Sequence, residues 1–404
     1  FSRFQTRYFQ GRYGDLDSAV LSYGPCQTPT LGFVVQRHVE IETFIPEPYW
    51  LLDLTVFKAG RSCKAIWGGG RSFNKGRIEQ YLKKVSESER PSAKVLSVVS
   101  KEKKQGRPTP LNTVGMLKAC SKALGIGPHA ALQTAERLYL QGFLSYPRTE
   151  STKYPASFDV NSALRTQSND RHWGSYVRDL LKDGGAKKPK GGIDMGDHPP
   201  ITPCRASDGY LSGDMARVYD LVTRHFIASV SHDAVWQSTR VELALEELGE
   251  KGTFSIAAKE MVSPGFLAVM LHKQYGDDRE TDGLREEEDE DEKQLPKFTK
   301  DEMIPVVVGK NSSRSISSNV SVAEAVTSSR ASLQLKELMT TKPSYLSESE
   351  LISKMEKNCI GTDASISTHI ENILKRNYAE LITGRKLAPT KLGLVLCQGY
   401  HLIE

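Results

Sequence analysis

Apolar side chains, many of them aromatic or β-branched, gather in four stretches that are typical of β-strands. Residues 49–57 and 93–100 form the first two stretches, and residues 234–245 and 253–258 form the other two. A long segment with a different pattern separates the two pairs. The simplest topology has the chain leave a β domain, build an inserted domain and cross back.

The segment between the strand pairs has the spacing of helices. Apolar residues recur every three or four positions around Val114, Leu117 and Leu124, and the glycines of residues 125–127 interrupt the pattern. Pro128 begins a second helix, which we expect to end at Gly142. Residues 143–146 then suggest a short strand, so the segment predicts a helix-turn-helix followed by a strand. A further helix around residues 218–226 closes this domain.

A similar unit is predicted near the C-terminus. Ser347 and Glu350 have the spacing of a capping box, and they precede an apolar run. A turn at Gly361 separates this helix from a second one, and residues 378–389 suggest a hairpin around Gly384. Two helices followed by a hairpin predict a winged helix, which weakly resembles the inserted unit.

These patterns divide the chain into three predicted domains. Residues 1–45 and 320–404 form a winged-helix-like base domain, which includes a helix starting near Pro29. Residues 46–105 and 232–310 form a β-rich arch, and residues 106–231 form an inserted helical domain. Two stretches fall outside regular structure: an acidic loop at 277–292 and a serine-rich loop at 311–319.

The charge distribution favours a polyanionic partner. The 404 residues carry a net charge of +5, but residues 277–292 hold eleven acids and two arginines, so the rest carries +14. A basic protein with no such partner is equally compatible with charge alone. The six cysteines lie far apart without a CxxC pair, which argues against a zinc site and a disulfide framework. No apolar run is long enough to span a membrane.

Tyr146, Pro147 and Arg148 form the segment best suited to chemistry on a phosphodiester. In an extended chain, side chains two residues apart point to the same side, so the phenol and the guanidinium would face one substrate. Proline lacks a ladder donor, which places the segment at an edge or a cleft rim. A tyrosine can attack phosphorus while an arginine grips the phosphate oxygens. On local sequence alone, a structural tyrosine beside a surface arginine is the favoured interpretation.

Such a nucleophile needs help from its surroundings. Ionising an ordinary phenol at pH 7 costs about 4 kcal/mol, so a lysine, a metal ion or both are expected nearby. His198 lies in the proline-framed segment 197–203, where it would bind a phosphate or tune the tyrosine. An ordinary loop histidine is the alternative interpretation.

Two further segments offer phosphate contacts. Lys187, Lys188 and Lys190 lie on the glycine-rich stretch 184–192, which is a weak signal. Residues 361–365 open a helix, whose first peptide N–H groups can bind a phosphate. A simple capping role for Asp363 explains the same residues equally well.

Four segments, in their order and spacing, resemble motifs of one family, the type IA DNA topoisomerases. Residues 142–150 (GFLSYPRTE) resemble the active-site signature, and residues 22–31 (SYGPCQTPTL) resemble the GxxQ(T/S)PTL segment. Residues 197–203 and 361–365 resemble two further motifs. The resemblance covers almost the whole chain, and the Gly-Pro-Cys-Gln stretch is most similar to the eukaryotic beta form of topoisomerase III.

The resemblance implies a multidomain α and β fold, a toroidal core in which two winged-helix or CAP-like helical domains join a β-rich arch. It implies that the inserted domain swings away as a gate. It also assigns Tyr146 as the nucleophile and Arg148 as the residue that holds the scissile phosphate. The predicted contacts to single-stranded DNA are His198, Gln27, Thr362 and Ser365, together with Asp363, Lys187, Lys188 and Lys190.

The implied reaction is a transesterification that leaves a 5′-phosphotyrosyl link. The link conserves the bond energy, so resealing needs no ATP. The family holds Mg²⁺ in an N-terminal Toprim domain, whose acidic cluster has no counterpart in this sequence. We therefore expect Mg²⁺ to bind a Toprim domain of the same polypeptide, and this chain alone to bind single strands without cutting them.

Three other features depart from the family. Zinc-binding and Gly/Arg-rich tails are absent from the sequence, Cys359 stands where the family usually has glycine, and residues 312–335 resemble an insertion. The expected partners are single-stranded DNA and an accessory protein, and RNA is a second possible substrate. We do not expect the protein to bind a membrane. The nucleus is the expected location, with the cytoplasm also open.

Two rival interpretations remain. A non-enzymatic helix-turn-helix protein would bind palindromic duplexes and form no covalent adduct. A tyrosine recombinase or relaxase would need an Arg-His-Arg set or a paired-histidine metal site, and neither spacing is present.

Overall fold

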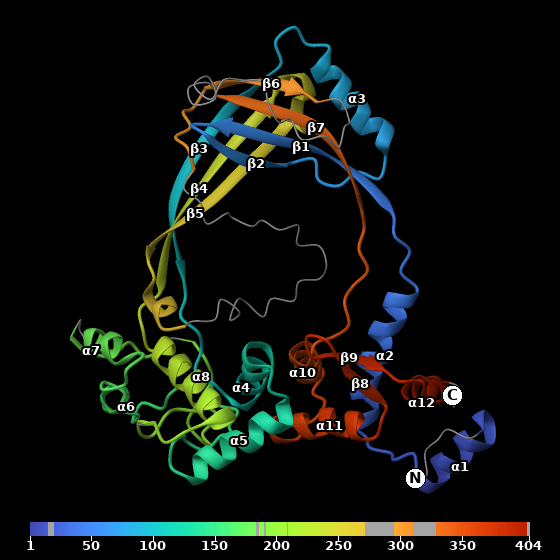
Figure 1. Ribbon diagram of the computed structural model, residues 1–404, viewed down its shortest axis with the longest axis vertical. Helices are drawn as coiled ribbons and strands as arrows, with labels where there is room; N and C mark the ends of the chain where they lie inside the picture. The colour runs from blue at the N-terminus through green and yellow to red at the C-terminus, as the bar shows by residue number, and fades with distance from the viewer. Residues whose placement is uncertain are drawn as a thin grey trace.

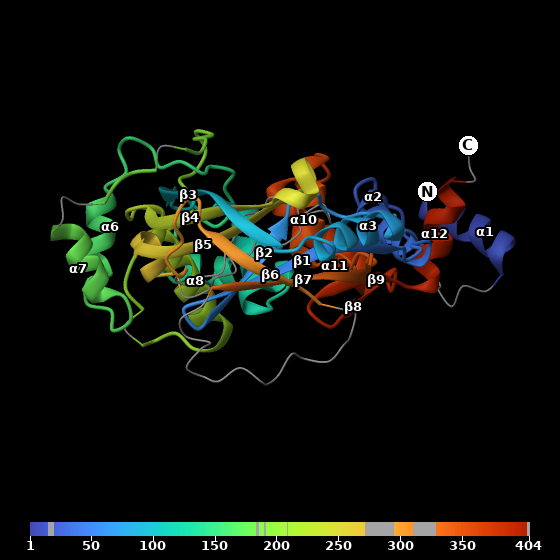
Figure 2. The same ribbon diagram turned by 90° about the horizontal axis from the view of Figure 1, so that it is seen from above.

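The computed structural model describes residues 1–14, 20–182, 186–189, 191–207, 209–270, 295–309 and 329–401. These residues form a ring-like arrangement with the β-strands at one end and two helical regions side by side at the other (Figure 1). Seen from above, the ring is flat, with the inserted domain and the base domain at opposite ends (Figure 2). Both termini lie on the base domain (Figure 1).

Seven strands form one closed barrel in the described part of the chain, in the order β1-β2-β5-β4-β3-β6-β7. All its pairs are antiparallel except the parallel pair β6 and β7. Alternate residues of β1, namely Leu52, Leu54 and Val56, point into the barrel core and are buried. The barrel strands are β1 (Pro48–Lys58), β2 (Arg61–Trp67), β3 (Ser92–Gln105), β4 (Ala234–Leu245), β5 (Thr253–Ser263), β6 (Met303–Val308) and β7 (Arg330–Met339).

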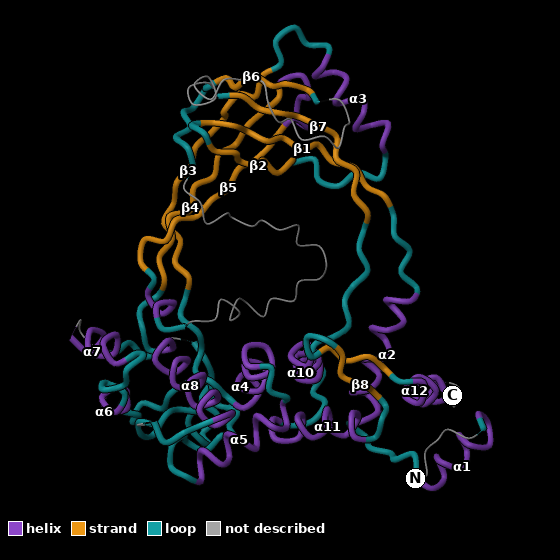
Figure 3. Tube along the Cα trace, viewed as in Figure 1, coloured by secondary structure: helices purple, strands orange, loops and turns teal. Residues whose placement is uncertain are grey.

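The inserted domain hangs from two neighbouring strands. β3 leads into it and β4 leads out, and their last paired residues are Gln105 and Ala234 (Figure 3). These strands are the predicted outward and return crossings. β3 and β5 extend beyond the predicted strands, because their distal halves pair with β4 as a stalk outside the barrel. The arch also includes α3 (Lys75–Ser86) and the short 3₁₀ segments η2 (Glu246–Gly252) and η3 (Gly265–Ala268).

The predicted start of the base domain at residue 320 is wrong. β7 pairs with β1 over ten positions, from Pro48 opposite Met339 to Phe57 opposite Arg330, so it belongs to the arch. Its alternating Ala331, Leu333 and Leu335 are buried in the barrel core. Residues 330–335, the end of the segment that resembles an insertion, form part of this core strand. The acidic loop 277–292 and the serine-rich loop 311–319 lie outside the described residues.

The inserted domain packs its helices around buried residues such as Leu117, Leu138 and Phe226. The predicted helix-turn-helix is present: a π-helical turn, Cys120–Leu124, ends the first helix, and Gly125 follows in the left-handed conformation. The inserted helices are α4 (Thr113–Ala119), α5 (Pro128–Leu140), α6 (Val160–Thr166), α7 (Gly174–Lys182) and α8 (Gly213–Ser229).

The strand predicted at residues 143–146 is wrong. Only Leu144 forms a β-bridge, to Pro203, and no ladder extends from it among the described residues. The partner segment contains three prolines, at 199, 200 and 203, and a proline cannot donate a ladder hydrogen bond.

The base domain contains the predicted winged helix. Ser347 and Glu350 form the predicted capping box, and the hairpin turns at Gly384. Cys359 adopts a φ of 53°, in the left-handed region that favours glycine. The base elements are α1 (Ser2–Tyr13), α2 (Gln27–Glu42), α10 (Glu348–Lys357), α11 (Asp363–Lys375), β8 (Ala379–Ile382), β9 (Lys386–Pro389) and α12 (Lys391–His401).

Candidate functional site

The segment that carries Tyr146 begins where α5 ends. Gly142 adopts a φ of 74°, its N–H donates to Tyr139, and Phe143 N–H donates to Leu138, which together close the helix. Phe143 and Leu144 are buried, so they anchor the segment in the inserted domain. Tyr146 therefore emerges from a rigid helix end without being part of a regular strand.

The proline-framed loop 197–203 lies beside this segment. Ser145 N–H donates to the carbonyl of Thr202 at 2.9 Å, and Thr202 N–H donates to Ser145 Oγ at 2.9 Å. Thr149 Oγ1 donates to the carbonyl of His198 at 3.0 Å. The structure thus brings together two segments that the sequence singled out separately.

The Tyr146 ring is half-buried between two other rings. Its centroid lies 4.7 Å from that of His198 and 5.2 Å from that of Tyr139, both in edge-on arrangements. These contacts fix the direction of the phenol. They also place the predicted residue His198 next to the predicted nucleophile.

The carboxylate next to His198 is also fixed. Asp197 accepts a hydrogen bond from the His198 backbone and one from Ser151 Oγ at 3.0 Å, and these bonds lower the pKa of Asp197. The side chain therefore stays ionised and holds the loop in place near Tyr146.

Arg148 is partly occupied by a residue that the sequence analysis missed. Its Nε and Nη2 atoms lie 2.7 and 2.6 Å from Glu136 Oε1, and its side chain remains 40% exposed. A phosphate at Arg148 must therefore compete with Glu136 for the guanidinium. No local pattern marks Glu136, because only the fold of α5 against the Tyr146 segment brings the two residues together.

Thr113 is a second residue that the sequence analysis missed. Its buried hydroxyl lies 2.8 Å from the carbonyl of Pro147 and accepts the N–H of Thr149 at 2.8 Å. It also lies 3.3 Å from Asp363 Oδ2, on the first residue of α11. Thr113 thus links the backbone on either side of Arg148 to the base domain.

The start of α11 corrects the capping interpretation of Asp363. Thr362 is the cap, in a capping box with Ser365, whose Oγ accepts Thr362 N–H at 2.8 Å. The simple capping role of Asp363 is therefore wrong, and its carboxylate contacts Thr113 instead. Gly361 has a φ of 81°, and a Cβ there would lie 3.0 Å from Ser365 Oγ, so glycine suits this turn.

The remaining predicted contacts are Gln27 and the three lysines of residues 187–190. Gln27 is buried at the start of α2, where its Nε2 donates to Ser22 and its Oε1 meets no hydrogen-bond donor among the described residues. Its contact with single-stranded DNA stays a prediction, and the buried side chain would have to become accessible to make it. Lys188 Nζ donates to the carbonyls of Pro155 and Ala156, which fastens its loop. Lys187 is exposed, and Lys190 lies outside the described residues.

No group of three or more His, Cys, Asp or Glu side chains is placed to hold a metal ion in the described part of the chain. Within the same residues, no helix is long and apolar enough to cross a bilayer.

Comparison with known proteins identifies the family to which the chain belongs. A model described as DNA topoisomerase matches residues 1–404. DNA topoisomerase 3-beta of Arabidopsis thaliana is 45% identical over 405 residues, and DNA topoisomerase 3-beta-1 of Homo sapiens is 42% identical over 407. Each alignment covers 100% of this chain but 42% of the relative, so the chain spans less than half the length of these curated relatives.

A solved structure shares the fold. Full-length topoisomerase I from Thermotoga maritima superposes with a TM-score of 0.66 at 19% identity. The match covers 95% of this chain and 56% of that one.

Proposed function

Because the chain belongs to the type IA DNA topoisomerase family, we propose that its polypeptide cleaves and reseals one DNA strand through a covalent link to Tyr146. One observation carries the proposal. The Tyr146 segment lies at the contact between the inserted and base domains, to which Thr113 and Asp363 connect it. A DNA strand cleaved at Tyr146 would therefore be cleaved beside the contact at which the ring-shaped protein would open.

The chemistry of the proposal is a balanced transesterification. The Tyr146 oxygen bonds to phosphorus and loses its proton, while the bond from phosphorus to the 3′ oxygen of the strand breaks and that oxygen gains a proton. The product is a 5′-phosphotyrosyl link and a free 3′ hydroxyl. Attack of this hydroxyl on the link reverses every step, and no ATP is consumed because the bond energy is conserved.

Arg148 is proposed to hold the scissile phosphate. Its two nitrogens that contact Glu136 would turn to the phosphate oxygens, which bind a guanidinium fork in a matching geometry. Glu136 then keeps Arg148 oriented in the absence of substrate. His198, in contact with the Tyr146 ring, is the proposed second phosphate contact.

The described residues do not fit a Mg²⁺ site, because they contain no cluster of three or more suitable ligands. No step in this chain is therefore assigned to a metal ion. We propose that Mg²⁺ is held by a Toprim domain of the same polypeptide. That domain would supply the stabilisation that a phenol needs to react at neutral pH.

The proposed substrate is single-stranded DNA, with RNA as a second candidate. The exposed start of α11 at Thr362 and Ser365, together with Lys187, supplies the proposed contacts in the described part of the chain. An accessory protein, a nuclear location and a cytoplasmic pool remain proposals from the resemblance. Membership of the family does not favour the non-enzymatic helix-turn-helix alternative.

The first prediction is that Tyr146→Phe abolishes the covalent adduct. The variant is tested in a polypeptide that joins this chain to a Toprim domain, with labelled single strands and Mg²⁺, followed by denaturing electrophoresis. Tyr139→Phe is the matched control, because its ring lies 5.2 Å from that of Tyr146. Adducts should persist in the control. Adducts in Tyr146→Phe, or cutting by this chain alone, would contradict the proposal.

A further inference from the structure

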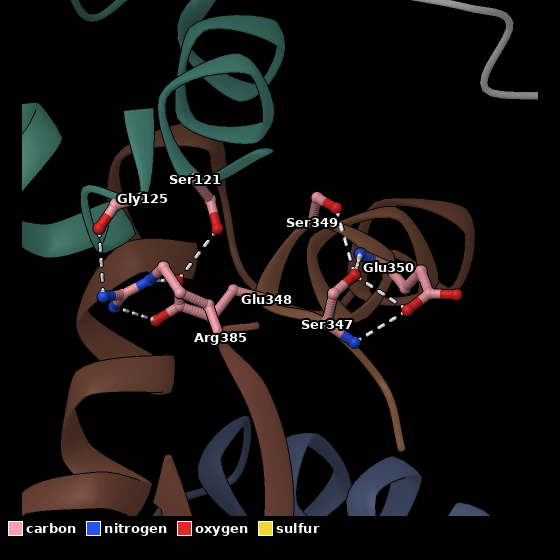
Figure 4. A network of polar contacts seen from close by, with 7 residues as sticks. All are labelled: Ser121, Gly125, Ser347, Glu348, Ser349, Glu350 and Arg385. Carbon is pink, nitrogen blue, oxygen red and sulfur yellow. Dashed lines mark hydrogen bonds and ion pairs between the residues drawn. The ribbon is translucent and has the colours of Figure 1, made fainter. Parts of the chain in front are cut away.

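A buried ion pair of the base domain lies directly against the glycine turn of the inserted domain. Glu348, the first residue of α10, and Arg385, in the turn of the β8–β9 hairpin, make this pair (Figure 4). Ser121 and Gly125 of the inserted domain contact it from the opposite side (Figure 4). The four residues thus join parts of the chain that are more than 200 positions apart.

The pair itself is held entirely within the base domain. Arg385 Nε lies 2.5 Å from Glu348 Oε2, and Arg385 Nη2 lies 2.7 Å from Glu348 Oε1. Their backbones are also joined, because Glu348 N–H donates to the carbonyl of Arg385 at 3.1 Å. The Glu348 side chain is 1% exposed and that of Arg385 is 29% exposed. Two-point contact and burial make this a rigid unit.

The inserted domain adds two hydrogen bonds and a close approach. Ser121 Oγ donates to Glu348 Oε2 at 2.9 Å, and Arg385 Nη1 donates to the carbonyl of Gly125 at 3.2 Å. A Cβ on Gly127 would lie 2.6 Å from Arg385 Nη2, so a larger residue there would have to displace the guanidinium. The glycine turn at residues 125–127 therefore packs closely against the ion pair and also forms hydrogen bonds with it.

This arrangement suits a contact that must open and close. Separating the two domains breaks the bonds from Ser121 and to Gly125, but it leaves the two charges paired on the base domain. Breaking a buried ion pair itself would be far more costly, because one charge would lose its partner. Once exposed, the ion pair is readily hydrated, whereas the apolar side chains that the two domains share in one cluster favour the closed joint.

We propose that the Glu348–Arg385 pair is the latch that holds the ring closed between the inserted domain and the base domain. The inference rests on the proposed function, in which this contact opens for strand passage. Two other polar contacts lie in the same joint: Lys118 Nζ with Glu356 at 3.0 Å, which is at the surface, and Thr113 with Asp363. In the ion pair itself Glu348 is almost fully buried, while Arg385 remains partly exposed.

Changes on the inserted side test the latch without breaking the ion pair. Ser121→Ala removes the hydrogen bond to Glu348, and a bond to a charged group corresponds to about a tenfold to hundredfold change in an equilibrium. Gly127→Ala pushes against Arg385, and its φ of −61° and ψ of 151° suit alanine without strain. Ser353→Ala is the matched control, because its hydroxyl bonds to Ser349 within α10.

The readout that needs no DNA is the distance between spin labels at the exposed positions Gln141, after α5, and Lys375, at the end of α11. Both latch variants should increase a longer-distance population by about tenfold or more, while the control matches the parent. Equal distributions in all four proteins would overturn the latch. This result is independent of adduct formation, so it separates failure of the latch from failure of the proposed function.

The second readout uses the polypeptide with its Toprim domain. The latch variants should form adducts at Tyr146 but reseal them more slowly than the control, because the open ring keeps the broken ends apart. Thermal unfolding should stay near that of the control. Equal resealing rates, or a matching loss of strand binding and cleavage, would assign these residues to structure alone.

Discussion

Two contacts close the ring between parts of the chain that are far apart in sequence. One is the pairing of strands β1 and β7, the other is the packing of helices α4 and α10, and they differ in their chemistry. The strands share ten paired positions and a continuous apolar core that includes Leu54 and Leu333. Between the helical domains, the described polar contacts are side-chain bonds such as those of Ser121 and Lys118.

The difference indicates which joint opens. Parting β1 from β7 would break a ladder of ten paired positions and expose the apolar side chains of the barrel core, at about 25 cal/mol per Å² of apolar surface. Parting the two helical domains breaks side-chain hydrogen bonds that water can replace, but it also exposes apolar side chains such as Leu117 and Ile366, which belong to one buried cluster. We therefore propose the barrel as the permanent closure and the Ser121–Glu348 region as the separable one. Tyr146 lies on the separable side.

The largest effect is expected in the barrel. Leu54→Ala removes a fully buried side chain from β1 and should lower the free energy of unfolding by about 2–5 kcal/mol. Chemical denaturation measures this loss, with Thr55→Ala, on the opposite face of the same strand, as the matched control. A loss below that of Thr55→Ala would contradict the barrel as the permanent closure.

A smaller effect is expected beside the nucleophile. Arg148→Lys keeps the charge but loses the fork, so cleavage should fall by about tenfold to a hundredfold while affinity for single strands changes little. The comparison of cleavage rate with affinity in one titration series is the measurement. An equal fall in affinity would make Arg148 a simple binding contact.

The smallest effect concerns the junction between the barrel stalk and the inserted domain. His225 on α8 lies 2.7 Å, through Nε2, from the carbonyl of Thr109, and burial lowers its pKa to about 4. The unfolded chain binds this proton more readily, so stability is full above the ordinary pKa near 6.5 and falls as the pH drops. The loss should be about 2 kcal/mol between about pH 7 and about pH 5.

Denaturation curves of the parent and His225→Gln at the two pH values measure this difference. The variant should lose the pH dependence, whatever its absolute stability. An unchanged slope would assign the acid sensitivity to other groups.

Much of the fold could be predicted from local patterns. The capping box at Ser347, the glycine turn at Gly125 and the hairpin at Gly384 each depend on a few neighbouring residues, and the structure contains all three. The family, predicted from four motifs, is confirmed by the match over residues 1–404. The predicted start of the base domain at residue 320 was wrong, although Ala331, Leu333 and Leu335 already alternate in the pattern of a half-buried strand.

The parts of the site that could not be predicted depend on distant contacts. Glu136 binds Arg148 across a turn, and Thr113 binds Asp363 across 250 positions, so neither pair has a spacing that a pattern can reveal. Gln27 belongs to a recognisable motif, yet its burial follows from the packing of α2. The motifs locate Tyr146 and His198, but only the fold shows that their rings touch.

The most direct test of the account is to lock each joint in turn. Cysteines at Lys118 and Glu356, whose charged atoms lie 3.0 Å apart, are joined by a cleavable bismaleimide across the separable joint. Cysteines at the register partners Thr55 and Ser332 lock the barrel as the control. The exposed native cysteines are first replaced by Cys204→Ser and Cys359→Gly.

Each locked polypeptide, joined to a Toprim domain, is assayed for adducts on single strands and for relaxation of supercoiled DNA. The account predicts that the lock between α4 and α10 preserves adduct formation but stops relaxation, and that cleaving the linker restores it. The barrel lock should leave both activities intact. Relaxation that continues with α4 and α10 locked together, or that stops with only β1 and β7 locked, would contradict the account.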